Sequence, residues 1–310
     1  MTWLSDAAVS HLRDVADWPI FASDRYEVVA PLARGGMGTV YRANDRELDR
    51  PVAIKVLSPT AWSSESLDRM RQETRILAQL EHPGVVPIYD VGQLEDGRLF
   101  YVMKLVRGQR LDEHAAGRTL AERLRLFVRV CDPVAFAHAR GVVHRDLKPE
   151  NVMVGEFGEV LVMDWGIAVG HAGGHANGAS GTIAGTRAYM APEQARGEAV
   201  DARADIFSLG AILEFLAAVA PKDAFASRPG RALTSIIGKA RAPDARARYA
   251  NVVALADDVN RYLEGDRVSA NPETLLDRAA RFSRKHRTAI VIVVAYLALR
   301  IVLALLAPHL

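Results

Sequence analysis

The 310-residue sequence contains a single cysteine, Cys131, and no evident internal repeat. One thiol cannot form a disulfide within the chain, which excludes a disulfide-stabilised secreted domain and favours a reducing compartment. Cys131 lies in a segment of helical periodicity, and we interpret it as a small hydrophobic core residue rather than a redox group.

The N-terminus lacks the apolar stretch and basic start of a signal peptide, because charged residues such as Asp6, Arg13 and Asp17 interrupt it. Its apolar residues have helical spacing, so residues 1–18 are expected to form an amphipathic helix within an N-terminal extension, residues 1–25. Packing against the domain that follows is the favoured use of this helix. Contact with a membrane surface or a partner is the alternative.

Acidic residues are missing from the C-terminal part of the sequence. From Arg278 onward there are six Lys or Arg residues and no Asp or Glu. The remaining 33 basic and 37 acidic residues give the rest of the chain a net charge of −4, against +2 overall. Five of the six basic residues precede residues 288–307, a run of 20 residues in which Arg300 is the only charged side chain. A helix of this length rises about 30 Å, which matches the hydrocarbon thickness of a bilayer.

We therefore predict a transmembrane helix over residues 288–307, preceded by a basic juxtamembrane linker, residues 266–287. The positive-inside rule places the basic side, and with it the rest of the chain, in the cytoplasm, as a single-pass protein of the cytoplasmic membrane. Arg300 would extend to the outer interface or face a partner helix. A hydrophobic helix that packs on protein is the alternative. The adjacent apolar run argues against nucleic acid as the partner of the basic segment.

The most specific feature of the sequence is residues 144–151, which read His-Arg-Asp-Leu-Lys-Pro-Glu-Asn. They place a carboxylate, an ammonium group and an amide within six positions, at Asp146, Lys148 and Asn151. Two shorter motifs follow: Asp-Trp-Gly after an expected strand, beginning at Asp164, and Ala-Pro-Glu at residues 191–193. Such side chains in this order are typical of loops that transfer phosphoryl groups.

A glycine-rich segment, residues 32–40, lies between two expected strands, residues 26–32 and 39–43. Backbone N–H groups in such a hairpin can approach phosphate oxygens, although hairpin glycines usually serve only the turn. The next expected strand, residues 52–55, is apolar except for Lys55, whose charge needs a negative partner. The phosphates of a nucleotide would supply that partner.

Residues 65–80 have apolar residues at helical spacing, and Glu73 shares their face with Met70 and Leu77. Alone, an inward Glu is usually a half-buried surface residue. With Lys55 available, an ion pair between Glu73 and Lys55 is the better interpretation.

Together these motifs resemble the serine/threonine protein kinase family, in particular the bacterial eukaryotic-like (Hanks-type) kinases. The resemblance covers about residues 26–265, the expected kinase domain. It implies an α+β, two-lobed protein kinase fold with a small β-rich N-terminal lobe and a mainly helical C-terminal lobe. The sequence adds one C-terminal transmembrane helix to this fold. Within this resemblance, the lysine two positions after Asp146, Lys148, favours the serine/threonine class over tyrosine kinases.

The resemblance implies a role for each matched residue. Asp146 would orient the attacking hydroxyl and Lys148 would stabilise the transferring phosphoryl group. Lys55, paired with Glu73, would position ATP. Asn151 and Asp164 would bind Mg²⁺, with Mn²⁺ as an alternative. The nucleotide pocket would be formed by loop, strand and hinge residues: Leu32, Gly35, Gly38, Val40, Ala53, Lys55 and Met103.

Two further contacts are implied near the Ala-Pro-Glu motif. Glu193 would pair with Arg248, which ties the activation segment, residues 167–186, to the C-terminal lobe. Asp205 would brace the backbone of the catalytic loop. Both contacts join residues that are distant in the sequence.

The sequence departs from the family pattern in several places. Ala33 replaces the first loop glycine, Trp165 replaces a phenylalanine, and Pro133 falls inside a predicted helix, where a kink is expected. Only about 20 residues lie between Leu216 and Ile236, where the family usually has a longer loop and an extra helix. This contraction puts ordinary substrate docking in doubt and favours autophosphorylation, or substrates confined to the membrane.

These observations predict an ATP- and Mg²⁺-dependent serine/threonine protein kinase that acts on protein substrates. Autophosphorylation would involve self-association in trans, and Arg145 could hold a phosphate on Ser180 or Thr182 of the activation segment. The alternative is a membrane-anchored, nucleotide-binding pseudokinase scaffold, which the departures favour and the complete set of site residues opposes. A small-molecule kinase is disfavoured, because the Ala-Pro-Glu segment resembles machinery that presents peptides.

Overall fold

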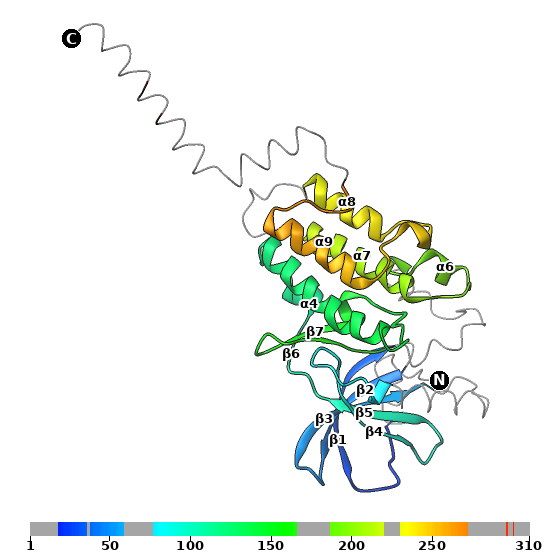
Figure 1. Ribbon diagram of the computed structural model, residues 1–310. Coiled ribbons are helices and arrows are strands. Elements are labelled where there is room, and N and C mark those ends of the chain that lie inside the picture. Colours follow the sequence, from blue (N-terminus) through cyan, green and yellow to red (C-terminus); the bar gives the residue numbers. More distant parts are fainter. Residues whose placement is uncertain are drawn as a thin grey trace, which may run out of the picture.

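The computed structural model describes residues 18–35, 38–58, 77–165, 187–219 and 230–271, together with Tyr296 and Arg300. These residues form two lobes, an N-terminal β-sheet and a C-terminal group of helices, with a small second sheet between them (Figure 1). The two-lobed α+β fold predicted from the sequence is confirmed.

The N-terminal lobe is a five-stranded antiparallel sheet of order β1-β2-β3-β5-β4. Its strands are β1 (Tyr26–Gly35), β2 (Gly38–Asp45), β3 (Arg50–Leu57), β4 (Ile88–Gln93) and β5 (Leu99–Lys104). Lys55 lies opposite Val40 on one side and Tyr101 on the other, and Ala53 lies opposite Met103. Opposite residues, and residues two apart in a strand, share a face, so these five side chains lie on one face of the sheet.

The other face of this sheet is covered by residues that precede β1. Phe21 packs edge-on against Phe100, with ring centroids 4.9 Å apart, and Trp18 packs against Tyr41 at 5.8 Å. The N-terminal extension therefore contacts the N-terminal lobe through its last residues.

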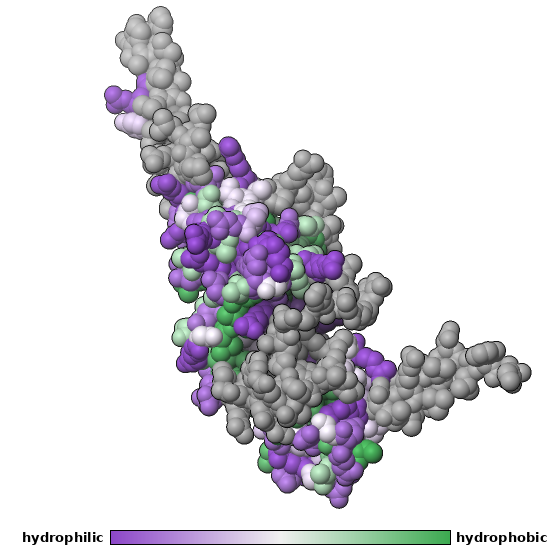
Figure 2. Space-filling view, turned by 90° about the vertical axis from the view of Figure 1, so that its right-hand side faces the viewer, coloured by the Kyte–Doolittle hydropathy of each residue, from purple (hydrophilic) through white to green (hydrophobic). Residues whose placement is uncertain are grey.

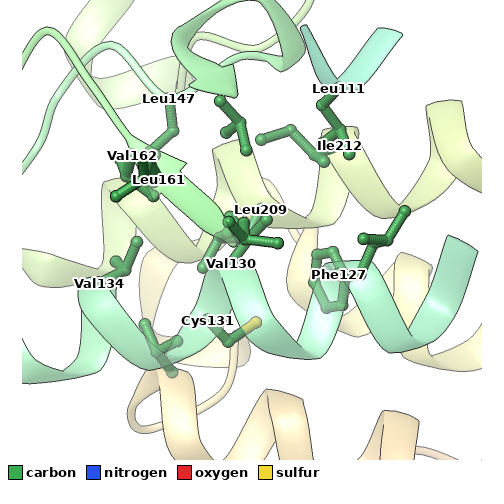
Figure 3. Close-up of a cluster of buried hydrophobic side chains, with 14 of the residues drawn as sticks. Leu111, Phe127, Val130, Cys131, Val134, Leu147, Leu161, Val162, Leu209 and Ile212 are labelled. Atoms are coloured by element: carbon green, nitrogen blue, oxygen red, sulfur yellow. The ribbon is translucent and has the colours of Figure 1, made fainter. Parts of the chain in front are cut away.

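The C-terminal lobe is built around α4 (Leu120–His138), α7 (Ala202–Ala218), α8 (Arg231–Ala240) and α9 (Val252–Glu264). A capping box starts α4: Glu122 N–H donates to Thr119 Oγ1, and Thr119 N–H donates to the Glu122 carboxylate. In the core, side chains of α4, α7 and β8 meet Leu147 of the catalytic loop (Figure 3). Cys131 is buried in this core, as predicted.

Shorter elements connect the two lobes and complete the C-terminal one. They are β6 (Gly108–Arg110), α3 (Leu111–His114), η1 (Pro149–Asn151), β7 (Val152–Gly155), β8 (Val160–Val162), α6 (Pro192–Ala195) and η3 (Ala245–Ala247). The strands β6, β7 and β8 form an antiparallel sheet in that order.

Residues 84–86 attach the N-terminal lobe to this small sheet. Val86 N–H donates to the carbonyl of Val162 at 3.2 Å, and Val162 N–H donates to the carbonyl of Gly84 at 2.8 Å. A Cβ on Gly84 would come within 3.0 Å of the Pro133 ring, so the two residues are in close contact. The helix α4 continues through Pro133 to His138, and the contact gives this interior proline a packing role.

Exposed large hydrophobic residues are few and scattered over the described surface. The face drawn in Figure 2 is mainly hydrophilic over the C-terminal lobe, with hydrophobic residues in small separate areas. Scattered residues of this kind are normal for a folded surface.

Several predictions concern residues outside the described ranges. These are the N-terminal amphipathic helix, Glu73 and most of its helix, Ser180 and Thr182, residues 220–229 of the contracted region, and residues 288–307 except Tyr296 and Arg300. Within the described part of the chain, no helix is long and apolar enough to cross a membrane. The transmembrane helix over residues 288–307 stays a prediction.

Candidate active site

The predicted catalytic loop, residues 144–151, is held in place by Asp205, a fully buried carboxylate in the first turn of α7. The backbone N–H groups of His144 and Arg145 donate to its two oxygens at 2.7 and 2.8 Å, and His138 Nε2 lies 2.7 Å from one of them. Arg145 has a φ of 67°, in the left-handed region that costs a non-glycine residue about 1–2 kcal/mol. The two bonds to Asp205 stabilise this turn and confirm the predicted bracing contact.

Asp146, Lys148 and Asn151 form one hydrogen-bonded unit. Lys148 Nζ lies 3.1 Å from Asp146 Oδ2, and Asn151 Nδ2 donates to the same oxygen at 3.0 Å and to the Asp146 carbonyl at 2.8 Å. The side chain of Asp146 is 15% exposed and that of Lys148 is 22% exposed. The carboxylate is therefore fixed in orientation while remaining partly open to solvent.

Buried His144 connects this loop to the Asp-Trp-Gly motif. Its Nε2 lies 2.9 Å from the carbonyl of Met163, and its Nδ1 accepts from Asp146 N–H at 3.3 Å. A carbonyl can only accept, so Nε2 carries the proton and the ring is neutral. Burial lowers the pKa of His144, which agrees with this assignment. Trp165 packs on the His144 ring and donates its indole N–H to the Val162 carbonyl, and its side chain is buried.

Lys55 pairs with Asp164, the first residue of the Asp-Trp-Gly motif. Its Nζ lies 2.7 Å from Asp164 Oδ1, and Lys55 is buried. The predicted partner Glu73 lies outside the described residues, so that pair stays a prediction. Asp164 has a φ of 56°, again in the left-handed region.

Sequence reasoning missed Tyr101, whose hydroxyl lies 3.4 Å from Asp164 Oδ1. Burial, together with the nearby Asp164 carboxylate, raises the pKa of Tyr101 well above its usual value, so the hydroxyl stays protonated. The signal that could have found it is the strand register, which sets Tyr101 opposite Lys55.

The predicted nucleotide residues fall into two groups. The first group lies on the sheet face that packs against the large hydrophobic core. It consists of Val40, Ala53, Lys55 and Met103. Leu32, Gly35 and Gly38 lie at the hairpin between β1 and β2, where Leu32 is 51% exposed. Gly38 has a φ of 145°, and a Cβ there would collide with the carbonyl of Val56, so the hairpin requires glycine at this position.

The site has the donors that a nucleotide and a hard cation need. Asn151 uses its Nδ2 for Asp146, which leaves its amide oxygen for a cation, and Asp164 supplies a carboxylate. Among the described residues, no group of three or more His, Cys, Asp or Glu could hold a metal ion by itself. A site with one carboxylate, one amide oxygen and the phosphates of a nucleotide suits Mg²⁺, which keeps few protein ligands.

The Ala-Pro-Glu segment is anchored to the C-terminal lobe by a buried ion pair. Arg248 donates to both oxygens of Glu193 at 2.6 and 2.7 Å and to the Arg203 carbonyl at 2.8 Å. The hydrogen bonds from Arg248 hold the pKa of Glu193 below its usual value. The predicted pair is confirmed.

Gln194, the residue after this glutamate, was not singled out in the sequence. Its Nε2 donates to the carbonyl of Arg145 at 2.7 Å, so the Ala-Pro-Glu segment also contacts the catalytic loop. A glutamine side chain carries no sequence signal for such a contact, because the contact depends on the tertiary arrangement of the two segments.

A family model described as a protein kinase domain matches residues 26–271. The chain is similar to serine/threonine-protein kinase PknD of Protochlamydia amoebophila, with 32% identity over 298 residues that cover 78% of this chain and 30% of that protein. It is also similar to serine/threonine-protein kinase PknB of Mycobacterium tuberculosis, with 40% identity over 204 residues that cover 63% of this chain and 32% of that protein. The matches thus span less than a third of either relative.

Among solved structures, the PknI kinase domain of M. tuberculosis has a similar fold, with a TM-score of 0.61 and 28% sequence identity. The similarity covers 79% of this chain and 97% of that domain.

Proposed function

The chain belongs to the protein kinase family, and on that premise we propose that it is a serine/threonine protein kinase. It would transfer the γ-phosphate of ATP to Ser or Thr hydroxyls of proteins, including those of its own activation segment. The unit of Asp146, Lys148 and Asn151 carries this proposal. The printed names of the similar proteins PknD and PknB support the serine/threonine class.

Each side chain of the unit has a role that its geometry supports. The Asp146 carboxylate orients the incoming hydroxyl and takes its proton, because it is fixed by two donors and still partly exposed. Lys148 neutralises charge on the phosphoryl group as it transfers. Most of the rate enhancement then comes from positioning and electrostatic stabilisation.

Protein kinases use ATP and a divalent cation, and we assign the cation to Asn151 and Asp164. Mg²⁺ fits these oxygen donors, with Mn²⁺ as the alternative. When bound, the cation neutralises phosphate charge. Lys55 binds the phosphates and pairs with Glu73, while the apolar residues Val40, Ala53 and Met103 contact the base. Leu32 and the glycines of the hairpin close over the nucleotide.

Arg145 is assigned to phosphate on the activation segment. Its Nε is buried and has no hydrogen-bond partner within the described part of the chain. A buried guanidinium donor without an acceptor is costly, and a phosphate on Ser180 or Thr182 would supply the acceptor. Phosphorylation in trans between two copies would place it there.

The membrane proposal keeps residues 288–307 as a single span, with the kinase domain in the cytoplasm. The 20-residue apolar run and the basic residues before it support this assignment. A reporter enzyme that is active only outside the cytoplasm, fused after Leu310, is expected to be active. A second reporter active only in the cytoplasm should be silent at that position, and the opposite pattern would contradict the span.

The proposed activity is tested by incubating the purified full-length chain with γ-³²P-labelled ATP, Mg²⁺ and a general protein substrate. Labelled phosphoserine or phosphothreonine after acid hydrolysis is the expected result. Nucleotide binding without any transfer would instead support the pseudokinase scaffold. Label on phosphotyrosine alone would contradict the serine/threonine class.

A further inference from the structure

Asp258, in α9, is fully buried and its carboxylate accepts five hydrogen bonds. Three come from the segment that follows the helix: Ser269 N–H at 2.8 Å, Ser269 Oγ at 2.7 Å and Ala270 N–H at 3.0 Å. The Tyr249 hydroxyl and Arg261 supply the other two, at 2.9 and 3.1 Å. Burial alone would raise the pKa of Asp258, but the hydrogen bonds from Ser269, Tyr249 and Ala270 hold it below its usual value, so the group is charged at neutral pH.

These bonds attach residues 266–271 to the C-terminal lobe. Gly265, with a φ of 74°, ends α9, and the next N–H, that of Asp266, donates back to the carbonyl of Arg261 at 2.7 Å. Val268 is then buried against the main core. The chain therefore folds back on α9 before it continues into the basic linker, and Asp258 is the group that holds it there.

Ser269 is an exposed residue, unlike Tyr249, the other residue with a hydroxyl group in this network. Lys239 Nζ, from α8, lies 3.4 Å from its Oγ, and the same ammonium lies over the Tyr249 ring at 4.3 Å. The Ser269 oxygen thus lies between the buried carboxylate of Asp258 and the half-buried ammonium of Lys239.

From this geometry we propose that Ser269 is a phosphorylation site, and that its phosphate detaches residues 266–271 from Asp258. The proposal rests on the kinase activity proposed above. Ser269 Oγ forms a bond to the γ-phosphorus of ATP, the bond from that phosphorus to the β,γ-bridging oxygen breaks, and ADP leaves. The hydroxyl proton passes to the Asp146 carboxylate of the copy that acts as kinase. Ser269 reaches that site when the segment opens locally, and the phosphate then prevents the segment from closing.

Phosphorylation acts on both the hydrogen bonds and the charge of this network. The esterified Oγ has no proton to donate to Asp258, and the phosphate places a charge of about −1.5 to −2 beside a buried carboxylate. Two anions at such short range repel, because the Asp258 carboxylate is fully buried and therefore poorly screened by water. Lys239 becomes the partner of the phosphate, and the closed position of the segment is lost.

The site is tested on the full-length chain in detergent, incubated with Mg²⁺ and ATP beside the Asp146→Asn variant. Phosphate on Ser269 in the first chain and not in the second is the expected result of mass-spectrometric mapping. Phosphate on other Ser or Thr residues but none on Ser269 would overturn the site and leave the kinase activity intact. No phosphate on the chain or on an added protein substrate would overturn the kinase activity, and with it the source of phosphate.

Release of the segment is measured separately, by hydrogen exchange on a chain with Ser269→phosphoserine encoded during synthesis, so this result does not depend on activity. The amides of Ser269 and Ala270 are expected to exchange about tenfold faster or more than in the unmodified chain. Ser269→Ala keeps the hydrogen bonds from the two backbone N–H groups to Asp258, so it should accelerate exchange less than phosphoserine does.

The matched control is phosphoserine at Ser235. This residue is half-buried on α8, and its Oγ donates at 3.0 Å to the Arg231 carbonyl of the same helix. The control should leave exchange at Ser269 and Ala270 unchanged. The proposed release of residues 266–271 is overturned if phosphoserine at position 269 does not accelerate exchange at Ser269 and Ala270. It is also overturned if phosphoserine at position 235 accelerates that exchange equally.

Discussion

Replacing Asp205 with asparagine should loosen the catalytic loop, because this carboxylate of α7 accepts hydrogen bonds from the loop's backbone. Asp205 accepts from His144 N–H, Arg145 N–H and His138 at 2.7–2.8 Å in a fully buried position. Asparagine offers one oxygen, so one of the two backbone N–H groups would face an NH₂ group. Losing a hydrogen bond to a charged group costs about 1.5–3 kcal/mol, and an unsatisfied buried donor costs about 1–3 kcal/mol more. Asp205→Asn should therefore lower the free energy of unfolding by about 3–5 kcal/mol.

The same change should slow phosphotransfer, because the strained turn at Arg145 directly precedes Asp146. If about 3 kcal/mol of the loss falls on loop positioning, kcat should drop about a hundredfold. Asp201→Asn is the matched control, since Asp201 is the exposed N-cap of the same helix and asparagine caps equally well. Denaturant unfolding and a coupled ADP-release assay measure the two quantities. Equal stability and equal kcat in the two variants would refute the bracing role.

Three further outcomes are expected. Gly38→Ala should weaken ATP binding about tenfold or more in calorimetry, because its Cβ collides with backbone at a φ of 145°, whereas Gly35→Ala, with open space around its Cβ, should change little. The pKa of Glu193 is lowered mainly by hydrogen bonds from Arg248, so its contribution to stability is complete above about pH 4.5 and is lost as pH falls through the lower, folded-state pKa. Glu193→Gln should remove that acid-dependent loss in denaturant titrations, and an unchanged pH profile would contradict it. Gln194→Leu should lower kcat about fivefold and leave the KM for ATP unchanged, because it removes a hydrogen bond worth about 1 kcal/mol to the catalytic loop and none to nucleotide.

Much of the site could be predicted because its residues lie in short motifs of characteristic chemistry. The unit of Asp146, Lys148 and Asn151 falls within six positions, so local spacing already brings the side chains together. The contacts of Asp205 and of Glu193 with Arg248 are distant in sequence, and only the family resemblance indicated them.

Contacts that depend on register or on the packing of helices could not be predicted. Tyr101 reaches Asp164 because β5 pairs with β3 in one particular register, which composition does not determine. Gln194 and Asp258 have ordinary side chains at unremarkable positions, and their partners become visible only when separate segments meet. The predicted kinase domain ended at residue 265, where α9 ends, and the pattern carried no sign that the next residues fold back on Asp258.

The central claim is that Asp146 serves as the base in phosphoryl transfer to Ser and Thr hydroxyls. The most direct measurement compares the rate of phosphate incorporation from Mg-ATP by the unmodified chain, Asp146→Asn and Asp132→Asn, the last an exposed aspartate on α4. The account predicts equal rates for the unmodified chain and Asp132→Asn. For Asp146→Asn it predicts a rate that is lower by a factor of about a hundred or more. Transfer by Asp146→Asn at the unmodified rate would contradict it.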